Sequence, residues 1–321
     1  MINKKIDVAS AYPFLHVISN MFVCNADCHF CYLHEHDRRT GIFDEEKQNQ
    51  LLFTVEEWLK RQTADIFMLL IMGGEITLNP YILPKLQEWF ERYPGLHLEL
   101  TTNLATTKME WLEFFCDDRI TLKVSLNESN AADYKKTMGV DYFDLVLKNL
   151  KFLKLHRREP LLVSTVLTRE HLIQDKTVAF FEFVAEVLGD TRVIVLPETS
   201  WFGEIDSFTQ EEKKHALKLL ETAKRFYPEG YKPFKDQMYT KIASGPKKSL
   251  VLKECPWKNN VQISDLLEVK PCCWFDKVIG NVETIEQFNK ALKYKEKLNE
   301  NIKRGRVLDF CLRTCGIVKD D

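Results

Sequence analysis

The sequence predicts an α/β fold built on a parallel β-sheet. Three observations lead to this prediction. Short apolar runs alternate with segments of helical periodicity, which is typical of βα units with parallel strands. The run at residues 66–72 is apolar without interruption, the pattern of a strand buried on both faces. Polar residues also follow the ends of several runs, where a parallel fold places its ligand site.

Six apolar runs are predicted as the strands of this sheet. They cover residues 14–23, 66–72, 96–101, 120–126, 161–167 and 192–196. With right-handed crossovers, six βα units either curl into a barrel or lie in an open sheet. Six units are too few for the closed eight-stranded barrel.

The segments between these runs have the apolar spacing of helices. Asp44 is the expected N-cap of the first helix, and Pro94 and Gly95 are expected to stop the second, which begins at about residue 81. Later helices are expected around residues 111–115, 143–155 and 178–188, and a further helix is expected to end near residue 226. This order places a helix after each strand of the sheet.

Length, charge and composition indicate an ordinary globular protein. The chain has 321 residues, of which 45% are hydrophobic and 29% charged, and this length suits one large domain or two. Its 45 basic and 47 acidic residues give a net charge of −2, so no general nucleic-acid or membrane binding is expected. No apolar run reaches the roughly 18 residues that span a bilayer, and no signal peptide is apparent. We therefore expect a cytoplasmic protein whose cysteines serve as metal ligands rather than as disulfides.

Three cysteines stand close together in the loop that follows the first predicted strand. Cys24, Cys28 and Cys31 fall within eight residues, close enough to hold three corners of a 4Fe–4S cube, which proteins usually bind through four thiolates. The missing fourth ligand would leave one iron open for a substrate or cofactor. Two alternatives stay open: a tetrahedral zinc site completed by a histidine from residues 29–36, and cysteines that are simply core residues.

The C-x3-C-x2-C spacing, with Phe30 between the last two cysteines, resembles the signature of the radical S-adenosylmethionine (radical SAM) enzymes. The resemblance implies a partial (βα)6 barrel in which the open iron is chelated by the amino and carboxylate groups of SAM. One electron from the cluster then cleaves SAM to a 5′-deoxyadenosyl radical, which abstracts a hydrogen atom from the substrate. A flavodoxin or ferredoxin is implied as the electron donor.

The second predicted strand ends in Gly73-Gly74-Glu75. Two glycines allow the backbone to approach a ligand closely, and the carboxylate can accept a hydrogen bond from an ammonium group. The segment resembles the Gly-Gly-Glu motif of the family, which holds the methionine amino group of SAM. Ile76 follows it where the family most often has proline.

The third and fourth predicted strands also end in polar residues. Thr102 and Asn103 are similar to a Thr-Asn pair that the family has near its substrate cavity. Ser125 and Asn127 share one face of the fourth strand, and they match family positions that contact the methionine carboxylate and the ribose of SAM. Many relatives have aspartate where Asn127 stands, but an amide can still bond a ribose hydroxyl. Each of these residues also has the ordinary alternative of turn formation or helix capping.

From about residue 227 the sequence becomes richer in turns, so we divide the chain into a barrel domain, residues 1–226, and a smaller domain, residues 227–321. A hairpin is expected from the runs at residues 261–263 and 267–269, followed by a helix at residues 284–302. The second domain holds five cysteines, four of which could close around one metal centre; the five are Cys255, Cys272, Cys273, Cys311 and Cys315.

This tail resembles the SPASM/twitch extension of radical SAM enzymes, and the single-cluster twitch form fits its cysteine count better. The resemblance implies an auxiliary iron–sulfur cluster, of the 4Fe–4S type, with Cys272 preferred over Cys273 as a ligand because it follows Pro271. Leu267 stands where the family pattern has glycine, which leaves the hairpin turn in doubt. A structural zinc site with four cysteine ligands is the alternative.

These observations together predict a radical SAM enzyme, an oxidoreductase or a maturase of peptides or small molecules. Its expected substrate is a small metabolite (a sugar, cyclitol or nucleotide) or a ribosomal peptide. The expected outcome is oxidation, epimerisation or bond formation in a biosynthetic pathway. A non-catalytic zinc-binding interaction protein is the alternative, and iron analysis separates the two.

Overall fold

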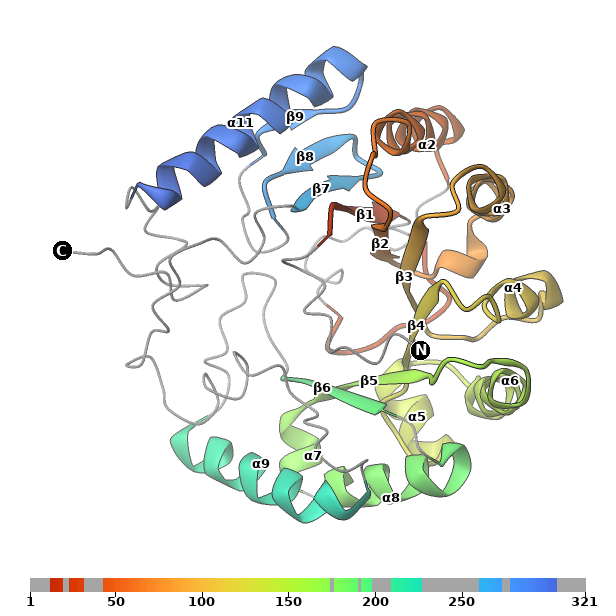
Figure 1. Ribbon diagram of the computed structural model, residues 1–321. Coiled ribbons are helices and arrows are strands. Elements are labelled where there is room, and N and C mark those ends of the chain that lie inside the picture. The colour runs from red at the N-terminus through yellow and green to blue at the C-terminus, as the bar shows by residue number, and fades with distance from the viewer. Residues whose placement is uncertain are drawn as a thin grey trace.

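The computed structural model describes residues 12–19, 23–31, 43–173, 176–189, 192–197, 209–226, 260–272 and 278–304. Within these residues one nine-stranded sheet has the order β6-β5-β4-β3-β2-β1-β7-β8-β9 (Figure 1). The first six strands are β1 Phe14–Ser19, β2 Phe67–Gly73, β3 Leu96–Thr102, β4 Ile120–Ser125, β5 Leu162–Leu167 and β6 Arg192–Pro197. Each is parallel to its neighbour, so the predicted α/β fold with a parallel sheet is confirmed.

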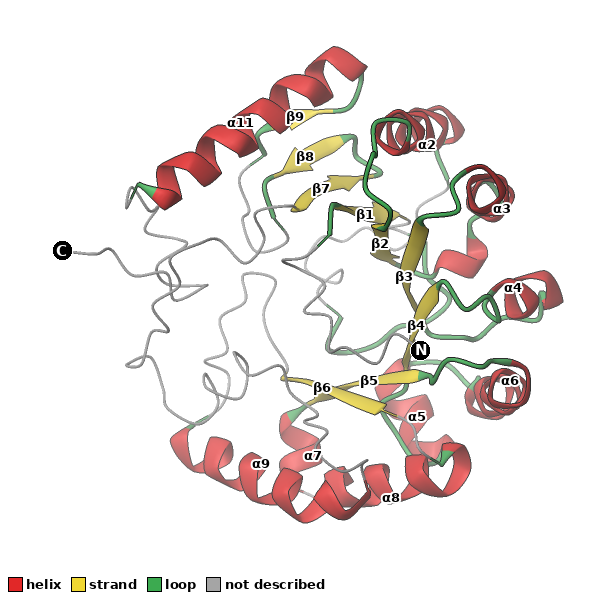
Figure 2. Ribbon diagram, in the orientation of Figure 1, coloured by secondary structure: helices red, strands yellow, loops and turns green. Residues whose placement is uncertain are grey.

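Helices cover the outer face of this curved sheet (Figure 2). They are α2 Glu45–Leu59, α3 Ile82–Arg92, α4 Met109–Phe114, α5 Ala131–Met138, α6 Phe143–His156, α7 Arg169–Ile173, α8 Lys176–Leu188, α9 Gln210–Ala223 and α11 Ile285–Lys303. The predicted N-cap of α2 is confirmed, because the Asp44 carboxylate accepts a hydrogen bond from the backbone N–H of Lys47. The sequence analysis missed α5 and α7, which are too short and too polar to show an apolar period.

The two faces of the strands differ in chemistry. Alternate residues such as Leu15 and Val17 face the helices and are almost fully buried in the core, where each contributes about 1.5–3 kcal/mol by burial. The residues between them face the concave interior and include His16, Glu99 and Lys123. The interior face is therefore partly polar, whereas a sheet that served stability alone would not need polar side chains on that face.

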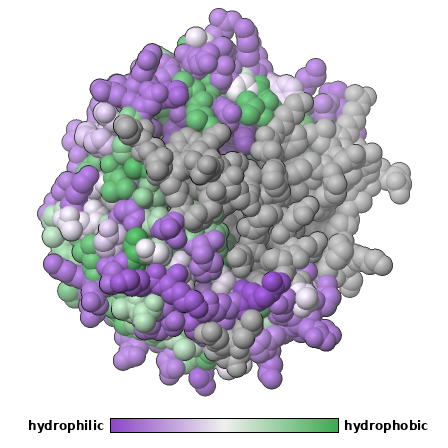
Figure 3. Space-filling view, turned by 180° about the vertical axis from the view of Figure 1, so that it is seen from behind, coloured by the Kyte–Doolittle hydropathy of each residue, from purple (hydrophilic) through white to green (hydrophobic). Residues whose placement is uncertain are grey.

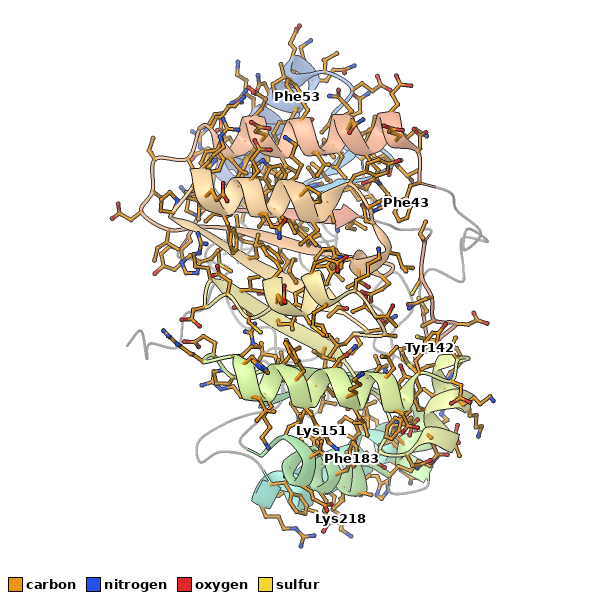
Figure 4. The ribbon with its side chains drawn as sticks, turned by 90° about the vertical axis from the view of Figure 1, so that its right-hand side faces the viewer. Phe43, Phe53, Tyr142, Lys151, Phe183 and Lys218 are labelled. Atoms are coloured by element: carbon orange, nitrogen blue, oxygen red, sulfur yellow. The ribbon has the colours of Figure 1, made fainter. Side chains whose placement is uncertain are left out.

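On the face seen in Figure 3, the described residues are predominantly hydrophilic, with small apolar patches between polar side chains. Figure 4 shows Lys151 of α6 and Lys218 of α9 on the outer helices, and Phe53 of α2 is an exposed aromatic residue among them. In the part of the chain that the structure describes, no helix has the length and apolar character needed to cross a bilayer.

The remaining strands are β7 Asn260–Ser264, β8 Glu268–Lys270 and β9 Gly280–Asn281. The predicted hairpin is confirmed, since β7 and β8 pair in antiparallel fashion. β7 also pairs in parallel with β1, so the sheet of the barrel continues into residues that we assigned to the second domain. α11 follows with the Thr284–Gln287 capping box, and the helix agrees with the predicted residues 284–302.

Leu267 lies in the turn of this hairpin with a positive φ of 62°, the conformation that explains why glycine is the expected residue there. A left-handed conformation costs a residue with a Cβ about 1–2 kcal/mol. We expect Leu267→Gly to be more stable than Leu267→Ala by about 1 kcal/mol, because both lose the side chain but only glycine is free of the φ penalty. Denaturant unfolding of the two variants measures this difference, and equal stabilities would contradict it.

Candidate active site

The carboxyl ends of β1 to β4 bring the predicted site residues to one edge of the sheet. The cysteine loop, residues 23–31, follows β1, and residues 73–75 end β2. The backbone N–H of Glu75 donates to the carbonyl of Val23 at 3.0 Å. The loop that carries the three cysteines is therefore fastened directly to the Gly-Gly-Glu segment.

Glu75 is a fully buried carboxylate. Its Oε1 accepts from the Thr77 N–H at 3.1 Å and from the hydroxyls of Thr77 and Thr102 at 2.8 and 2.7 Å. Its Oε2 accepts from the Asn103 N–H at 2.7 Å. Burial raises the pKa of Glu75, and these hydrogen bonds oppose the rise without cancelling it. The carboxylate thus joins the ends of β2 and β3, in addition to any contact it makes with a ligand.

Gly73 has a φ of 151°, a conformation that is essentially restricted to glycine. It stands at the last position of β2, in register with Ser19 of β1. A side chain at this position would force the backbone to change just before Glu75. The backbone conformation at position 73 therefore requires glycine, the first residue of the predicted motif, whether or not a ligand is bound.

Asn103 links the end of β3 to the cysteine loop. Its amide Nδ2 donates to Asn25 Oδ1 at 2.8 Å and lies 4.0 Å from Cys24 Sγ. Asn25 in turn donates to the carbonyl of Ala105 at 2.8 Å. The predicted Thr-Asn pair therefore orders the residues around the site, with Thr102 on Glu75 and Asn103 on the loop.

The other side of the cysteine loop rests on the carboxyl end of α5. The N–H of Asp27 donates to the Met138 carbonyl at 2.7 Å, and the N–H of His29 donates to the Thr137 carbonyl at 3.2 Å. The thiol of Cys28 lies 3.5 Å from the Met138 sulfur. Because the first two contacts use backbone atoms, they hold the loop whatever its side chains bind.

Gly139 ends α5 with a φ of 69°, and a Cβ added there would lie 2.7 Å from the Cβ of Asp27. We expect Gly139→Ala to lower the free energy of unfolding by about 2 kcal/mol or more, because the backbone penalty adds to this clash. Gly189 is the matched control, since its φ is 72° but, among the described residues, its added Cβ would meet Lys154 Nζ alone, at 3.7 Å. Denaturant unfolding should show a larger loss for Gly139→Ala, and equal losses would contradict the contact.

Ser125 and Asn127 stand at the end of β4 in different surroundings. Ser125 is half-buried on the interior face, whereas Asn127 is buried. The Asn127 Oδ1 accepts from the Val166 N–H at 2.8 Å, and its Nδ2 donates to the Met138 sulfur at 3.3 Å. In this structure the Asn127 amide therefore joins β4 to β5 and α5, and Ser125 is the more accessible of the two.

A buried polar network lies behind Asn127, and the sequence analysis missed it. His171 Nε2 lies 3.0 Å from the Asn127 carbonyl and 3.4 Å from Glu128 Oε1, and its Nδ1 lies 2.6 Å from the Thr168 hydroxyl. The hydroxyl of Thr137 donates to Glu128 Oε1 at 2.5 Å. Burial lowers the pKa of His171, but the hydrogen bond and charge of Glu128 outweigh it and leave the pKa above its ordinary value.

This raised pKa predicts a pH dependence of stability. The charged His171 stabilises the fold fully below the pKa of the unfolded chain, and this contribution is lost as the pH rises through the folded pKa. The advantage of the wild type over His171→Gln should therefore shrink with rising pH, by at most about 1.4 kcal/mol per pH unit. Unfolding measured from pH 6 to 9, with His215→Gln as the matched control on α9, checks this, and parallel curves would contradict it.

The cysteines predicted as metal ligands are only partly described. Cys24, Cys28 and Cys31 are half-buried in one loop, and burial together with the neighbouring thiols of Cys31 and Cys24 raises the pKa of Cys28 to about 12. Within the described residues, no three histidine, cysteine, aspartate or glutamate side chains form a preformed metal site. Phe30 is half-buried, and its ring forms a T-shaped pair with His29 at a centroid distance of 5.3 Å.

The second predicted metal site falls largely outside the described residues. Cys272 is buried just after β8. The other residues named for this site or as its alternative lie beyond the described ranges: Cys255, Cys273, Cys311 and Cys315. His34 and His36, two of the alternative zinc ligands, also lie outside them. The auxiliary cluster therefore stays a prediction.

Comparison with known proteins identifies the fold and the family signature. The family model described as the radical SAM superfamily matches residues 19–179. The structure of native anSMEcpe with bound AdoMet is 16% identical, with a TM-score of 0.64 over 95% of this chain and 88% of that chain. The structure of SuiB from Streptococcus suis bound to S-adenosylmethionine is also 16% identical, with a TM-score of 0.63 over 96% of this chain and 70% of that chain.

At these identities the two structures establish the similarity of fold alone. No curated protein matches the chain. The alternative of a non-catalytic zinc-binding protein finds no support in the comparisons.

Proposed function

This chain belongs to the radical SAM superfamily, whose members are enzymes that use a 4Fe–4S cluster and SAM, and from that premise we propose that it cleaves SAM reductively and abstracts a hydrogen atom from its substrate. The substrate is a small metabolite or a ribosomal peptide, and the product is oxidised, epimerised or newly bonded. When bound, the cluster and SAM supply the one-electron chemistry that no protein side chain provides.

The residues present fit this cofactor pair. Cys24, Cys28 and Cys31 would hold three irons of the cluster and leave the fourth for SAM. Gly73 and Gly74 would let the backbone approach the methionine moiety closely. Further SAM contacts would come from three residues at the strand ends and one in the loop: Glu75, Ser125, Asn127 and Phe30.

The observation that carries this proposal is the backbone anchoring of the cysteine loop. Bonds from Asp27 and His29 to α5, and from Glu75 to Val23, hold the loop from two sides. Because backbone hydrogen bonds set the conformation of this loop, it does not depend on the cysteine side chains, and the three thiolates can be held in position for the cluster. The AdoMet bound in structures of similar fold supports SAM as the ligand.

Anaerobic purification tests the proposal. Iron and sulfide analysis should give about four irons for the catalytic cluster, and dithionite with SAM should yield 5′-deoxyadenosine. Zinc without iron would overturn the proposal, as would an intact reduced cluster that forms no 5′-deoxyadenosine.

We also propose that residues 227–321 hold an auxiliary iron–sulfur cluster in a twitch-like arrangement, with Cys255, Cys272, Cys311 and Cys315 as ligands. A cluster held by four thiolates would exchange an electron with the substrate after hydrogen abstraction. A flavodoxin or ferredoxin would supply the electron for SAM cleavage, in the cytoplasm. An iron content near eight per chain supports the second cluster, and a content near four argues against it.

A further inference from the structure

Tyr134 is a fully buried residue of α5 that the sequence analysis did not identify. It stands one helical turn before Met138, so the two side chains lie on the same face of the helix. The Met138 sulfur lies 3.5 Å from Cys28 Sγ, and the carbonyls of this turn accept hydrogen bonds from the backbone N–H groups of Asp27 and His29. This face of α5 therefore packs against the cysteine loop.

The phenolic hydroxyl of Tyr134 is buried, and within the part of the chain that the structure describes it has no hydrogen-bond partner. A buried hydroxyl without a partner is unfavourable, and phenylalanine would fill the same space without that cost. The ring itself packs against Phe143 at a centroid distance of 5.6 Å. Packing explains why the position holds an aromatic residue, whereas the hydroxyl requires an acceptor.

The charged groups that act on this hydroxyl belong to the candidate active site. Burial raises the pKa of Tyr134, and the charges of Cys28, Glu75 and Cys24 raise it further, with Cys28 the strongest of the three. Such effects weaken with distance, so the phenol lies close to the cysteine loop and to the end of β2. It keeps its proton at neutral pH and can act as a hydrogen-bond donor.

Metal binding changes the hydrogen-bonding role of Cys28. As a thiol, Cys28 donates to the Met138 sulfur. A cysteine that binds a metal does so as a thiolate, which has no proton to donate and accepts hydrogen bonds instead. Met138 has no donor to offer, and the nearby Asn127 amide already donates to Met138. The hydroxyl of Tyr134, on the same face of α5, is the complementary donor.

We propose that the Tyr134 hydroxyl donates a hydrogen bond to the thiolate sulfur of Cys28 when this cysteine holds the cluster. Hydrogen bonds to the sulfurs are among the factors that set the reduction potential of an iron–sulfur cluster. A donor at the sulfur favours the reduced state, because that state carries more negative charge. Tyr134 therefore makes the cluster easier to reduce by the electron donor. This inference rests on the proposed function for the presence of the cluster.

The first test is a redox titration of the full-length, anaerobically reconstituted protein without SAM, followed by electron paramagnetic resonance. The signal of the catalytic cluster is the one that Cys28→Ala lacks, which separates it from any auxiliary cluster. At the potential where half of the wild-type cluster is reduced, we expect Tyr134→Phe to show about a tenfold lower ratio of reduced to oxidised cluster, which corresponds to about 59 mV for one electron. The substitution removes the hydroxyl and keeps the ring.

Tyr93→Phe is the matched control for this titration. It removes the same hydroxyl from a half-buried tyrosine, but Tyr93 follows α3 and precedes the amino end of β3, whereas the cysteine loop follows the carboxyl end of β1. We expect Tyr93→Phe to keep the wild-type ratio. A fall of less than about threefold in Tyr134→Phe, a rise, or an equal fall in Tyr93→Phe would overturn the proposal.

Electron–nuclear double resonance tests the hydrogen bond itself. After reconstitution in deuterated water, the wild type and Tyr93→Phe should show an exchangeable deuteron coupled to the cluster that Tyr134→Phe lacks. Identical couplings in the three proteins would mean that the hydroxyl does not donate to the cluster. If Tyr134→Phe instead binds SAM more weakly while its potential without SAM is unchanged, the hydroxyl serves SAM and the proposal is wrong.

These outcomes separate the role of Tyr134 from the proposed reaction. A protein that cleaves SAM but keeps its potential in Tyr134→Phe loses only the hydrogen bond. A protein whose potential shifts in Tyr134→Phe but that forms no 5′-deoxyadenosine loses only the proposed reaction. Zinc without iron would overturn both.

Discussion

Cys28→Ala should abolish the reductive cleavage of SAM while the protein remains folded. The backbone bonds that hold the loop, from Asp27 and His29 to α5, do not involve the Cys28 side chain. Loss of one thiolate would leave two ligands for a cluster that needs at least three from this loop. We expect the formation of 5′-deoxyadenosine to fall by on the order of 10³-fold or more, which corresponds to about 4 kcal/mol.

The matched control for this variant is Cys116→Ala. Cys116 is also half-buried, but its thiol bonds to the Leu112 carbonyl at 3.3 Å, and it precedes the amino end of β4, whereas the cysteine loop follows the carboxyl end of β1. Iron analysis and product assays should show that Cys116→Ala keeps the iron and the activity of the wild type. A Cys28→Ala protein that retains both would show that this loop does not hold the catalytic cluster.

Glu75→Gln should weaken both the fold and the binding of SAM. Both carboxylate oxygens accept hydrogen bonds, Oε1 from Thr77 and Thr102 and Oε2 from the Asn103 N–H. A carboxamide has one oxygen, so its NH2 group must face at least one of these donors whichever way it turns. We expect a loss of about 2–3 kcal/mol in the free energy of unfolding, because buried donors are left unpaired.

The consequence for SAM follows from the position of Asn103. This residue reaches Asn25 in the cysteine loop, so a shift at the end of β3 moves the loop as well. We expect at least a tenfold weaker Kd for SAM, measured by equilibrium dialysis with the reconstituted protein. Glu56→Gln is the matched control, since Glu56 forms ion pairs on the helix surface with Arg92, Lys85 and Lys60, each worth about 1 kcal/mol or less. Comparable losses in the two variants would contradict the structural role assigned to Glu75.

Local sequence patterns were enough to predict the main elements. The apolar run that became β2 ends within one residue of its predicted boundary, and Asp44 caps α2 as expected. The first strand ends at Ser19 rather than at residue 23, because apolar composition continues into the segment that leads to the cysteine loop. Boundaries of this kind depend on hydrogen bonds to neighbouring strands, which composition does not record.

The roles of individual polar residues were harder to predict. The sequence placed Glu75 and Asn127 at strand ends and indicated ligand contacts for them, with turn formation or helix capping as the alternative for Asn127, but it did not indicate their contacts with other strands. In the fold, Glu75 binds Thr102 and Asn103, and Asn127 binds Val166 and Met138. His171 carried no signal at all, because its partner Glu128 is distant in sequence and α7, the helix that carries His171, was not predicted.

The sequence by itself determined the alternation of strands and helices, the parallel sheet, and the spacing of Cys24, Cys28 and Cys31, because periodicity and motif spacing are properties of neighbouring residues. Only the tertiary structure decided which groups meet: the cysteine loop on α5, Glu75 on the end of β3, and β7 beside β1. These contacts join segments that are tens to hundreds of residues apart. Which segments meet depends on how the whole sheet buries its apolar face. The polar residues then pair with the groups that this packing places next to them.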